Sequence, residues 1–109
     1  MREPLLGSKT AEDVLTFILS RDNGYASEIA RFFSVSVYGI QRQLEKFELG
    51  GVLISKSVGK TRVYEFNPRY AFREELTALL MKAVALYPEE ERDRLLVHRR
   101  RPRRKGKSL

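Results

Sequence analysis

The sequence predicts one small domain of the α+β class, mainly helical, with a β-hairpin between its third and fourth helices. Three observations support this. Three segments within residues 8–49 carry apolar residues at helical spacing, two β-rich runs follow within residues 52–66, and a longer helical segment covers residues 72–87. A chain of 109 residues, 42% of them hydrophobic, is long enough to bury one core and too short for two ordinary domains.

The first helix should begin at Ser8 or Thr10, because either hydroxyl can cap a helix N-terminus, and should end near Ser20. Its apolar face has residues at spacings of three and four, namely Ala11, Val14, Leu15 and Ile18. Asn23-Gly24 then predicts a turn, since asparagine and glycine tolerate positive φ angles.

A second helix is expected over about residues 26–33, and the serines that follow should end it. Ser36 is a good cap for a third helix over residues 37–49. Its inward face should hold the residues at spacings 3, 4 and 3, namely Val37, Ile40, Leu44 and Phe47. Gly50-Gly51 should stop this helix with a left-handed cap.

Two strands are expected next, over residues 52–58 and 61–66, joined by the two-residue loop Gly59-Lys60. After the helix over residues 72–87, Pro88 allows a short helix within residues 88–98. Residues 99–109 should form a disordered tail, because seven like charges repel one another and nothing apolar anchors them.

This order of elements is that of a winged helix-turn-helix domain, here over residues 1–87. Three stretches resemble ArsR-type winged-helix regulators: Leu5–Thr10, Ser27–Arg31 and Leu44–Leu53. Tyr64–Pro68, followed by Glu75–Leu80, is similar to a prokaryotic subset of that superfamily, some members of which are fused to or encoded beside nucleotidyltransferase domains. The resemblance covers about residues 5–87 and implies a DNA-binding transcriptional regulator.

The formal net charge of +7 is unevenly distributed. Residues 99–107 hold seven of the 21 basic residues and no acid, so the rest of the chain is neutral overall. Within that neutral part, residues 31–73 carry eight basic and three acidic residues. This middle segment contains the third helix and the hairpin, so it predicts a polyanionic partner bound there.

The third helix should place its polar residues outward, opposite the apolar face, with no acid at the centre. Arginine can read guanine and glutamine can read adenine in the major groove, while lysine and tyrosine suit the sugar-phosphate backbone. The predicted DNA-contacting residues here are Ser36, Tyr38, Gly39, Gln41, Arg42, Gln43 and Lys46. The alternative is that the basic residues are merely solvated.

The hairpin tip should add contacts to the DNA backbone or the minor groove. Its predicted residues are Lys56, Lys60, Thr61 and Arg62. Lysine on a short exposed hairpin also discourages edge-to-edge aggregation, and both roles can hold together. The tail should supply non-specific phosphate contacts through Arg99, Arg100, Arg101, Arg103, Arg104, Lys105 and Lys107. Two other interpretations of the tail remain. It could bind RNA or an acidic partner, or it could serve as a solubilising terminus.

The apolar stripe of the helix over residues 72–87 is wider than a small core needs. It therefore predicts a two-fold homodimer whose recognition helices lie about one DNA turn apart. The predicted dimer residues are Leu76, Leu79, Leu80, Ala83, Val84 and Tyr87.

The composition argues against several other classes. The chain has no cysteine, and its one histidine, His98, adjoins the tail, so we expect no disulfide, metal centre, cofactor or catalytic triad, and no enzyme. No signal peptide or membrane span is recognisable, so we expect a cytoplasmic location. The sequence thus predicts a double-stranded DNA-binding regulator, a repressor or autoregulator. The alternatives are a protein-docking module for a partner such as a nucleotidyltransferase, and an RNA-binding domain.

Overall fold

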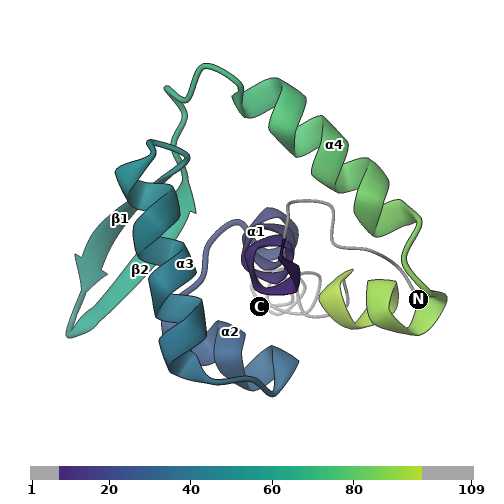
Figure 1. The fold of residues 1–109 in the computed structure, drawn as a ribbon, viewed down its shortest axis with the longest axis horizontal. Helices are drawn as coiled ribbons and strands as arrows, with labels where there is room; N and C mark the ends of the chain where they lie inside the picture. Colours follow the sequence, from purple (N-terminus) through teal and green to yellow (C-terminus); the bar gives the residue numbers. More distant parts are fainter. Residues whose placement is uncertain (1–7, 97–109) are drawn as a thin grey trace, which may run out of the picture.

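The computed structural model describes residues 8–96. Three helices come first: α1 (Lys9–Arg21), α2 (Ala26–Phe33) and α3 (Val37–Leu49). Strands β1 (Leu53–Val58) and β2 (Thr61–Phe66) form an antiparallel hairpin, and helix α4 (Arg73–Ala85) follows (Figure 1). A further helix covers residues 89–96. The predicted fold class, a winged helix with C-terminal helices, is confirmed. The predicted basic tail, including all seven of its basic residues at 99–107, lies outside the described residues.

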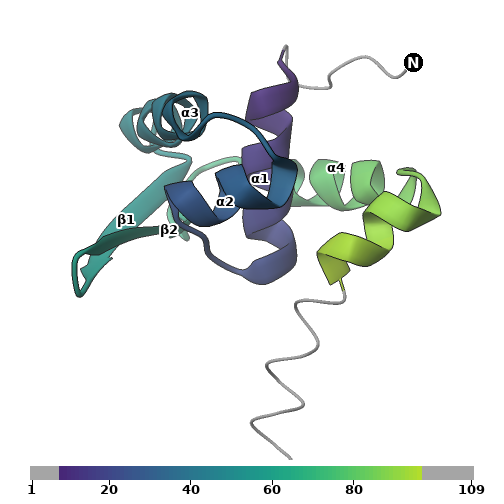
Figure 2. The same cartoon turned by 90° about the horizontal axis from the view of Figure 1, so that it is seen from below.

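Helix α1 lies at the centre of the domain, and Figures 1 and 2 place the hairpin and α4 on opposite sides of it. Ser8 is its cap, because the Ser8 hydroxyl accepts a hydrogen bond from the Ala11 N–H at 3.0 Å. All residues from 11 to 18 are buried, so the helix is covered on every side and not only along its apolar face. No helix within residues 8–96 is long and apolar enough to cross a membrane.

Burial on all sides places two carboxylates of α1 inside the protein. Glu12 is 2% exposed and accepts a hydrogen bond from the Tyr87 hydroxyl, which ties the end of α4 to α1. Asp13 is 5% exposed and lies 2.5 Å from the Lys9 ammonium, one turn earlier. Burial raises the pKa of Asp13, with Glu12 and Glu91 adding to the rise and Lys9 opposing it.

This raised pKa predicts a pH effect on stability. The native state holds the Asp13 proton more tightly than the unfolded chain, so the stabilisation is present below the carboxyl's ordinary pKa of about 3.9 and is lost as the pH rises through the native pKa. We expect Asp13→Asn to remove this loss. Urea unfolding across that window should show the wild type losing stability relative to the variant as the pH rises. Asp93→Asn, at an exposed site, is the control; parallel profiles for wild type and Asp13→Asn would contradict the assignment.

An aromatic cluster joins α1 to α2. The Phe17 ring is fully buried and meets the Phe32 ring edge-on, with 5.4 Å between the centroids. The Arg21 guanidinium lies 4.4 Å from the Phe17 centroid, and the Arg94 guanidinium lies 4.3 Å from that of Phe32. Arg94 also donates a hydrogen bond to the Phe32 carbonyl at 2.9 Å. The helix over residues 89–96 is thereby attached to α2.

The turn between α1 and α2 differs from the prediction. The positive φ lies at Asp22 (75°) and not at Asn23 or Gly24. The Gly24 N–H and carbonyl instead pair with the backbone of Tyr64 in β2, at 3.0 and 2.8 Å. A Cβ at residue 24 would lie 3.0 Å from the Phe17 ring. Close packing therefore favours glycine here, and its φ angle does not.

The β-hairpin has the predicted loop. Val58 pairs with Thr61, and Gly59 at the first loop position has φ of +64°, which favours glycine. Leu53 and Tyr64, at the other end of the hairpin, are buried in the core. At the end of α3 the left-handed residue is Gly51 (φ +82°), while Gly50 keeps a right-handed conformation.

Candidate nucleic-acid interface

Helix α3 is anchored by one face and leaves the other open. Ile40 and Leu44 are fully buried, and Phe47 is half-buried against the core. Val37 is 42% exposed, so the prediction that it packs inward is wrong. It stands in the first turn of α3, where the neighbouring elements cover it only in part.

The residues predicted to point outward from α3 do so. Tyr38 is 65% exposed, Gln41, Arg42 and Lys46 are exposed, and Gly39 and Gln43 are half-buried at one edge. Two further residues of this surface were not predicted: Glu45, which is exposed and puts an acid on the surface, and Leu49, which is 90% exposed. We call Tyr38, Gln41, Arg42, Glu45 and Lys46 the outer face of α3.

Several local contacts order this outer face. The Ser36 hydroxyl accepts a hydrogen bond from the Tyr38 N–H at 3.2 Å, so Ser36 acts as the helix cap. The Arg42 guanidinium lies 5.8 Å from the centroid of the Tyr38 ring, one turn earlier on the same side. A Cβ at Gly39 would meet nothing within 4 Å. The protein itself therefore gives no packing reason for glycine at this position, and the surface there is open to a partner.

A hollow of about 340 Å³ separates the outer face of α3 from the N-terminus of α1. Arg42 and Lys46 line it from α3, and Ser8 and Thr10 line it from α1. No carboxylate lies among its lining residues. The basic side of the outer face is therefore the side toward α1.

The hairpin carries its basic residues on two faces. Lys56 pairs with Val63 and Arg62 pairs with Ser57, and side chains alternate along a strand, so Lys56 and Arg62 point to opposite sides. The predicted basic residues of the hairpin therefore do not share one face. Lys60, in the loop, is exposed at the tip beside half-buried Thr61.

Arg62 carries a positive charge and also forms a hydrogen bond within the hairpin. Its Nη1 donates a hydrogen bond to the Ser55 hydroxyl at 2.7 Å, and that hydroxyl donates to the Glu48 carboxylate at 2.7 Å. This chain of contacts joins the two strands to the last turns of α3. It holds the hairpin alongside the helix whose outer face is exposed.

The residues predicted for dimerisation divide into two groups. Leu80, Val84 and Tyr87 are 0%, 7% and 4% exposed and belong to the core, so they form no free surface. Part of the apolar stripe of α4 packs against α1. The periodicity of the sequence alone could not show this. Of the other three, Leu76 and Ala83 are half-buried and Leu79 is 46% exposed.

Three exposed apolar residues on or beside α4 were not predicted: Met81 (61%) within the helix, and Phe72 (62%) and Leu86 (74%) at its two ends. Phe72 and Leu86 are the residues that flank α4 at its N- and C-terminal ends, and Leu79, within the helix, lies seven residues from each of them. We call Phe72, Leu79 and Leu86 the α4 stripe. The spacing of seven was readable in the sequence, but the core residues beside it gave a stronger signal.

Residues 8–96 contain no group of three or more histidine, cysteine, aspartate or glutamate side chains placed to hold a metal ion. The arrangement is instead that of a contact surface, with an exposed helix face, a hairpin fixed beside it and basic side chains on both. A scan against protein-family models found no match, and a search of curated proteins found none either.

Proposed function

We propose that the chain is a sequence-specific, double-stranded DNA-binding transcriptional regulator, a repressor or autoregulator, whose helix α3 enters the major groove. The observation that carries this proposal is the exposed outer face of α3 on a helix that is anchored by Ile40 and Leu44. The resemblance of the sequence to ArsR-type regulators supports the same function.

The outer face offers chemistry for both positioning and reading. Arg42 can donate two parallel hydrogen bonds to guanine, and Gln41 can pair with adenine. Glu45, about one turn further along α3, can accept a hydrogen bond from the amino group of cytosine. Tyr38 and Lys46 suit the sugar-phosphate backbone. The contact between Tyr38 and Arg42 restricts the arginine before DNA arrives, which lowers the entropy lost on binding.

The hairpin would contact the phosphate backbone on both of its faces. Lys60 at the tip, with Lys56 and Arg62 on opposite sides, presents positive charge to phosphates on either side of the hairpin. The hydrogen bonds from Arg62 to Ser55 and from Ser55 to Glu48 support a fixed angle between hairpin and recognition helix.

A homodimer would use the α4 stripe, because Phe72, Leu79 and Leu86 are exposed apolar residues on and beside α4. Two copies joined there would present two recognition helices to successive major grooves. Light scattering of the purified protein, alone and on duplex, should give the mass of a dimer; a monomer in both conditions contradicts this part of the proposal.

The proposed function is tested by selection from a pool of random duplexes at a stated salt concentration. The full chain should enrich one sequence. A chain that ends after His98 should enrich the same sequence, with uniformly weaker binding and a flatter salt dependence, because each phosphate neutralised contributes about −0.9 to the slope of log K against log salt. A pool that stays random after repeated rounds contradicts sequence-specific binding.

One observation favours a second candidate, a protein-docking module. The outer side of the hairpin carries exposed apolar residues, Ile54 (37%) and Val58 (56%), beside Lys56. Such a surface would suit a protein partner, for which the resemblance offers a nucleotidyltransferase. The selection discriminates the two functions, since a docking module would enrich no duplex. Including a single-stranded RNA pool in parallel tests the RNA-binding alternative.

A further inference from the structure

A groove of about 650 Å³ lies between α1, α3 and the beginning of α4. Its floor is apolar and only partly covered. Phe47, Val52 and Leu76 are half-buried there beside the buried Leu15. The volume lies within the range of about 300–1,000 Å³ that is typical of small-molecule sites.

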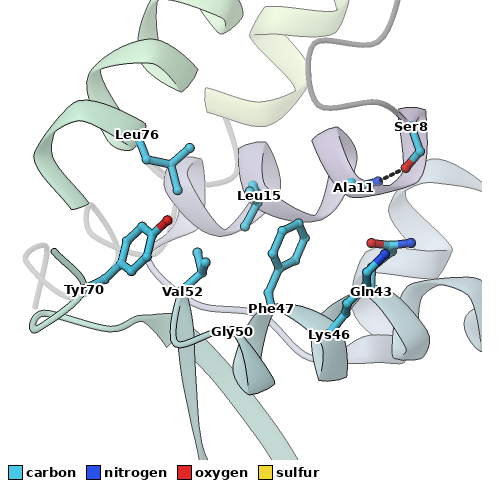
Figure 3. Close-up of a pocket in the computed structure, with 10 residues that line it drawn as sticks. All are labelled: Ser8, Ala11, Leu15, Gln43, Lys46, Phe47, Gly50, Val52, Tyr70 and Leu76. Carbon is cyan, nitrogen blue, oxygen red and sulfur yellow. Dashed lines mark hydrogen bonds between the residues drawn. The ribbon is translucent and has the colours of Figure 1, made fainter. Parts of the chain in front are cut away.

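The groove has one charged end. Figure 3 shows the apolar side chains in a row, with Tyr70 at one end and Gln43 and Lys46 at the other. Lys46 is the one charged residue among those lining the groove. It is exposed and forms no ion pair with another residue in the range 8–96. An apolar floor that ends at a single unpaired ammonium complements a molecule with an apolar body and one negative charge.

The same charged end belongs to the candidate nucleic-acid interface. Lys46, Gln43 and Ser8 line both this groove and the hollow of about 340 Å³ beside Arg42. An anion held by Lys46 would therefore neutralise a positive charge that a DNA phosphate also requires. Occupation of the groove and DNA binding would each weaken the other by the same factor.

We propose that the groove binds a monoanionic amphiphile, a carboxylate on an apolar body, and that this ligand acts as an inducer by taking Lys46 from DNA. The first half rests on the groove alone, and the second half rests on the proposed function. The two halves are separable by experiment, because ligand binding can be measured on the protein without DNA.

The site is tested by titrating decanoate, below its micelle concentration, into the isotopically labelled full chain and recording backbone amide spectra. We expect saturable shifts at Lys46, Phe47, Val52 and Leu76. Lys46→Gln should weaken decanoate binding about two- to fivefold, as expected for a solvent-exposed ion pair, and should leave the binding of uncharged decanol unchanged. Shifts that do not saturate, or that centre on the α4 stripe, overturn the groove assignment.

Leu76→Trp, which fills the groove, should abolish the saturable shifts. Met81→Trp is the matched control, because Met81 is 61% exposed on α4 and does not line the groove. If Leu76→Trp does not fold, the pattern of wild-type shifts still decides the site.

The inducer role is tested with the duplex enriched by selection. Decanoate should raise the Kd of the wild type for that duplex and should have no effect on the Lys46→Gln variant. Saturable groove binding with an unchanged Kd overturns the inducer role alone. A protein that binds decanoate in the groove and no duplex at all overturns the proposed function and the inducer role, and leaves the ligand site standing.

Discussion

Replacing Arg42 with alanine is expected to weaken binding to the selected duplex by about 1–3 kcal/mol, or about 5- to 150-fold, and to relax the base preference at one position. Arg42 is exposed at the middle of the outer face of α3, and its guanidinium lies near the Tyr38 ring. A guanidinium in this position can donate two parallel hydrogen bonds to guanine, which no other base accepts in the same geometry. The measurement is Kd by fluorescence anisotropy for selected and random duplexes.

Two further variants separate base recognition by Arg42 from the effect of its positive charge on affinity for DNA. Lys82→Ala removes the same charge from an exposed site on α4, away from α3, and should lower both affinities only slightly. Arg42→Lys keeps the charge but lacks the planar fork of donors, so it should also lose base preference. If Arg42→Ala weakens binding to selected and random duplexes equally, Arg42 contacts phosphate and the recognition role assigned to it is wrong.

Replacing Phe17 with alanine should destabilise the domain by about 3–5 kcal/mol. The Phe17 ring is fully buried, meets Phe32 edge-on and lies beneath the Arg21 guanidinium. Its removal leaves a cavity in the contact between α1 and α2 and takes away a ring face from the half-buried Arg21 guanidinium. Since domains of this size are stable by only about 5–15 kcal/mol, the change should be evident as a large fall in the urea midpoint.

The comparison for Phe17 is an exposed aromatic residue. Tyr38 is 65% exposed, so Tyr38→Ala should change the free energy of unfolding by less than about 0.5 kcal/mol. Phe17→Leu, which keeps most of the side-chain volume, should lower the free energy of unfolding by less than about 1.5 kcal/mol. It allows the role of Phe17 to be measured if the alanine variant does not fold. Equal effects of Phe17→Ala and Tyr38→Ala would contradict the central place of the Phe17 ring in the core.

The helices and the hairpin were predictable because their signals are local. Apolar residues three and four apart commit a segment to a helix whatever lies beside it, and Gly59-Lys60 between two β-rich runs commits the chain to a tight turn. The outer face of α3 followed from the same periodicity, since Ile40 and Leu44 define the inward direction. Glu45 and the neighbouring exposed Leu49 were not predicted, although the same helical periodicity would have placed both of them away from Ile40 and Leu44.

Other features depend on which elements meet, and local patterns contain no information on that. Val37 has the spacing of a core residue but is 42% exposed, while Glu12 and Asp13 have polar side chains and are buried. The role of Gly24 depends on the approach of Tyr64 from a strand forty residues later in the chain. The separation of Lys56 from Arg62 depends on strand register, because a shift of one residue would reverse every side chain.

From its residues alone, this chain specifies the order and type of its elements and the side of α3 that carries arginine, glutamine and lysine. Those properties arise from the period of a helix or strand, which is repeated within a few residues. The packing of the elements divided the apolar stripe of α4 between core and surface and buried two carboxylates of α1. It also formed the groove that ends at Lys46. Burial and hollows arise from contacts between distant segments, so they exist only once α1 is surrounded by the helices and the hairpin that cover it.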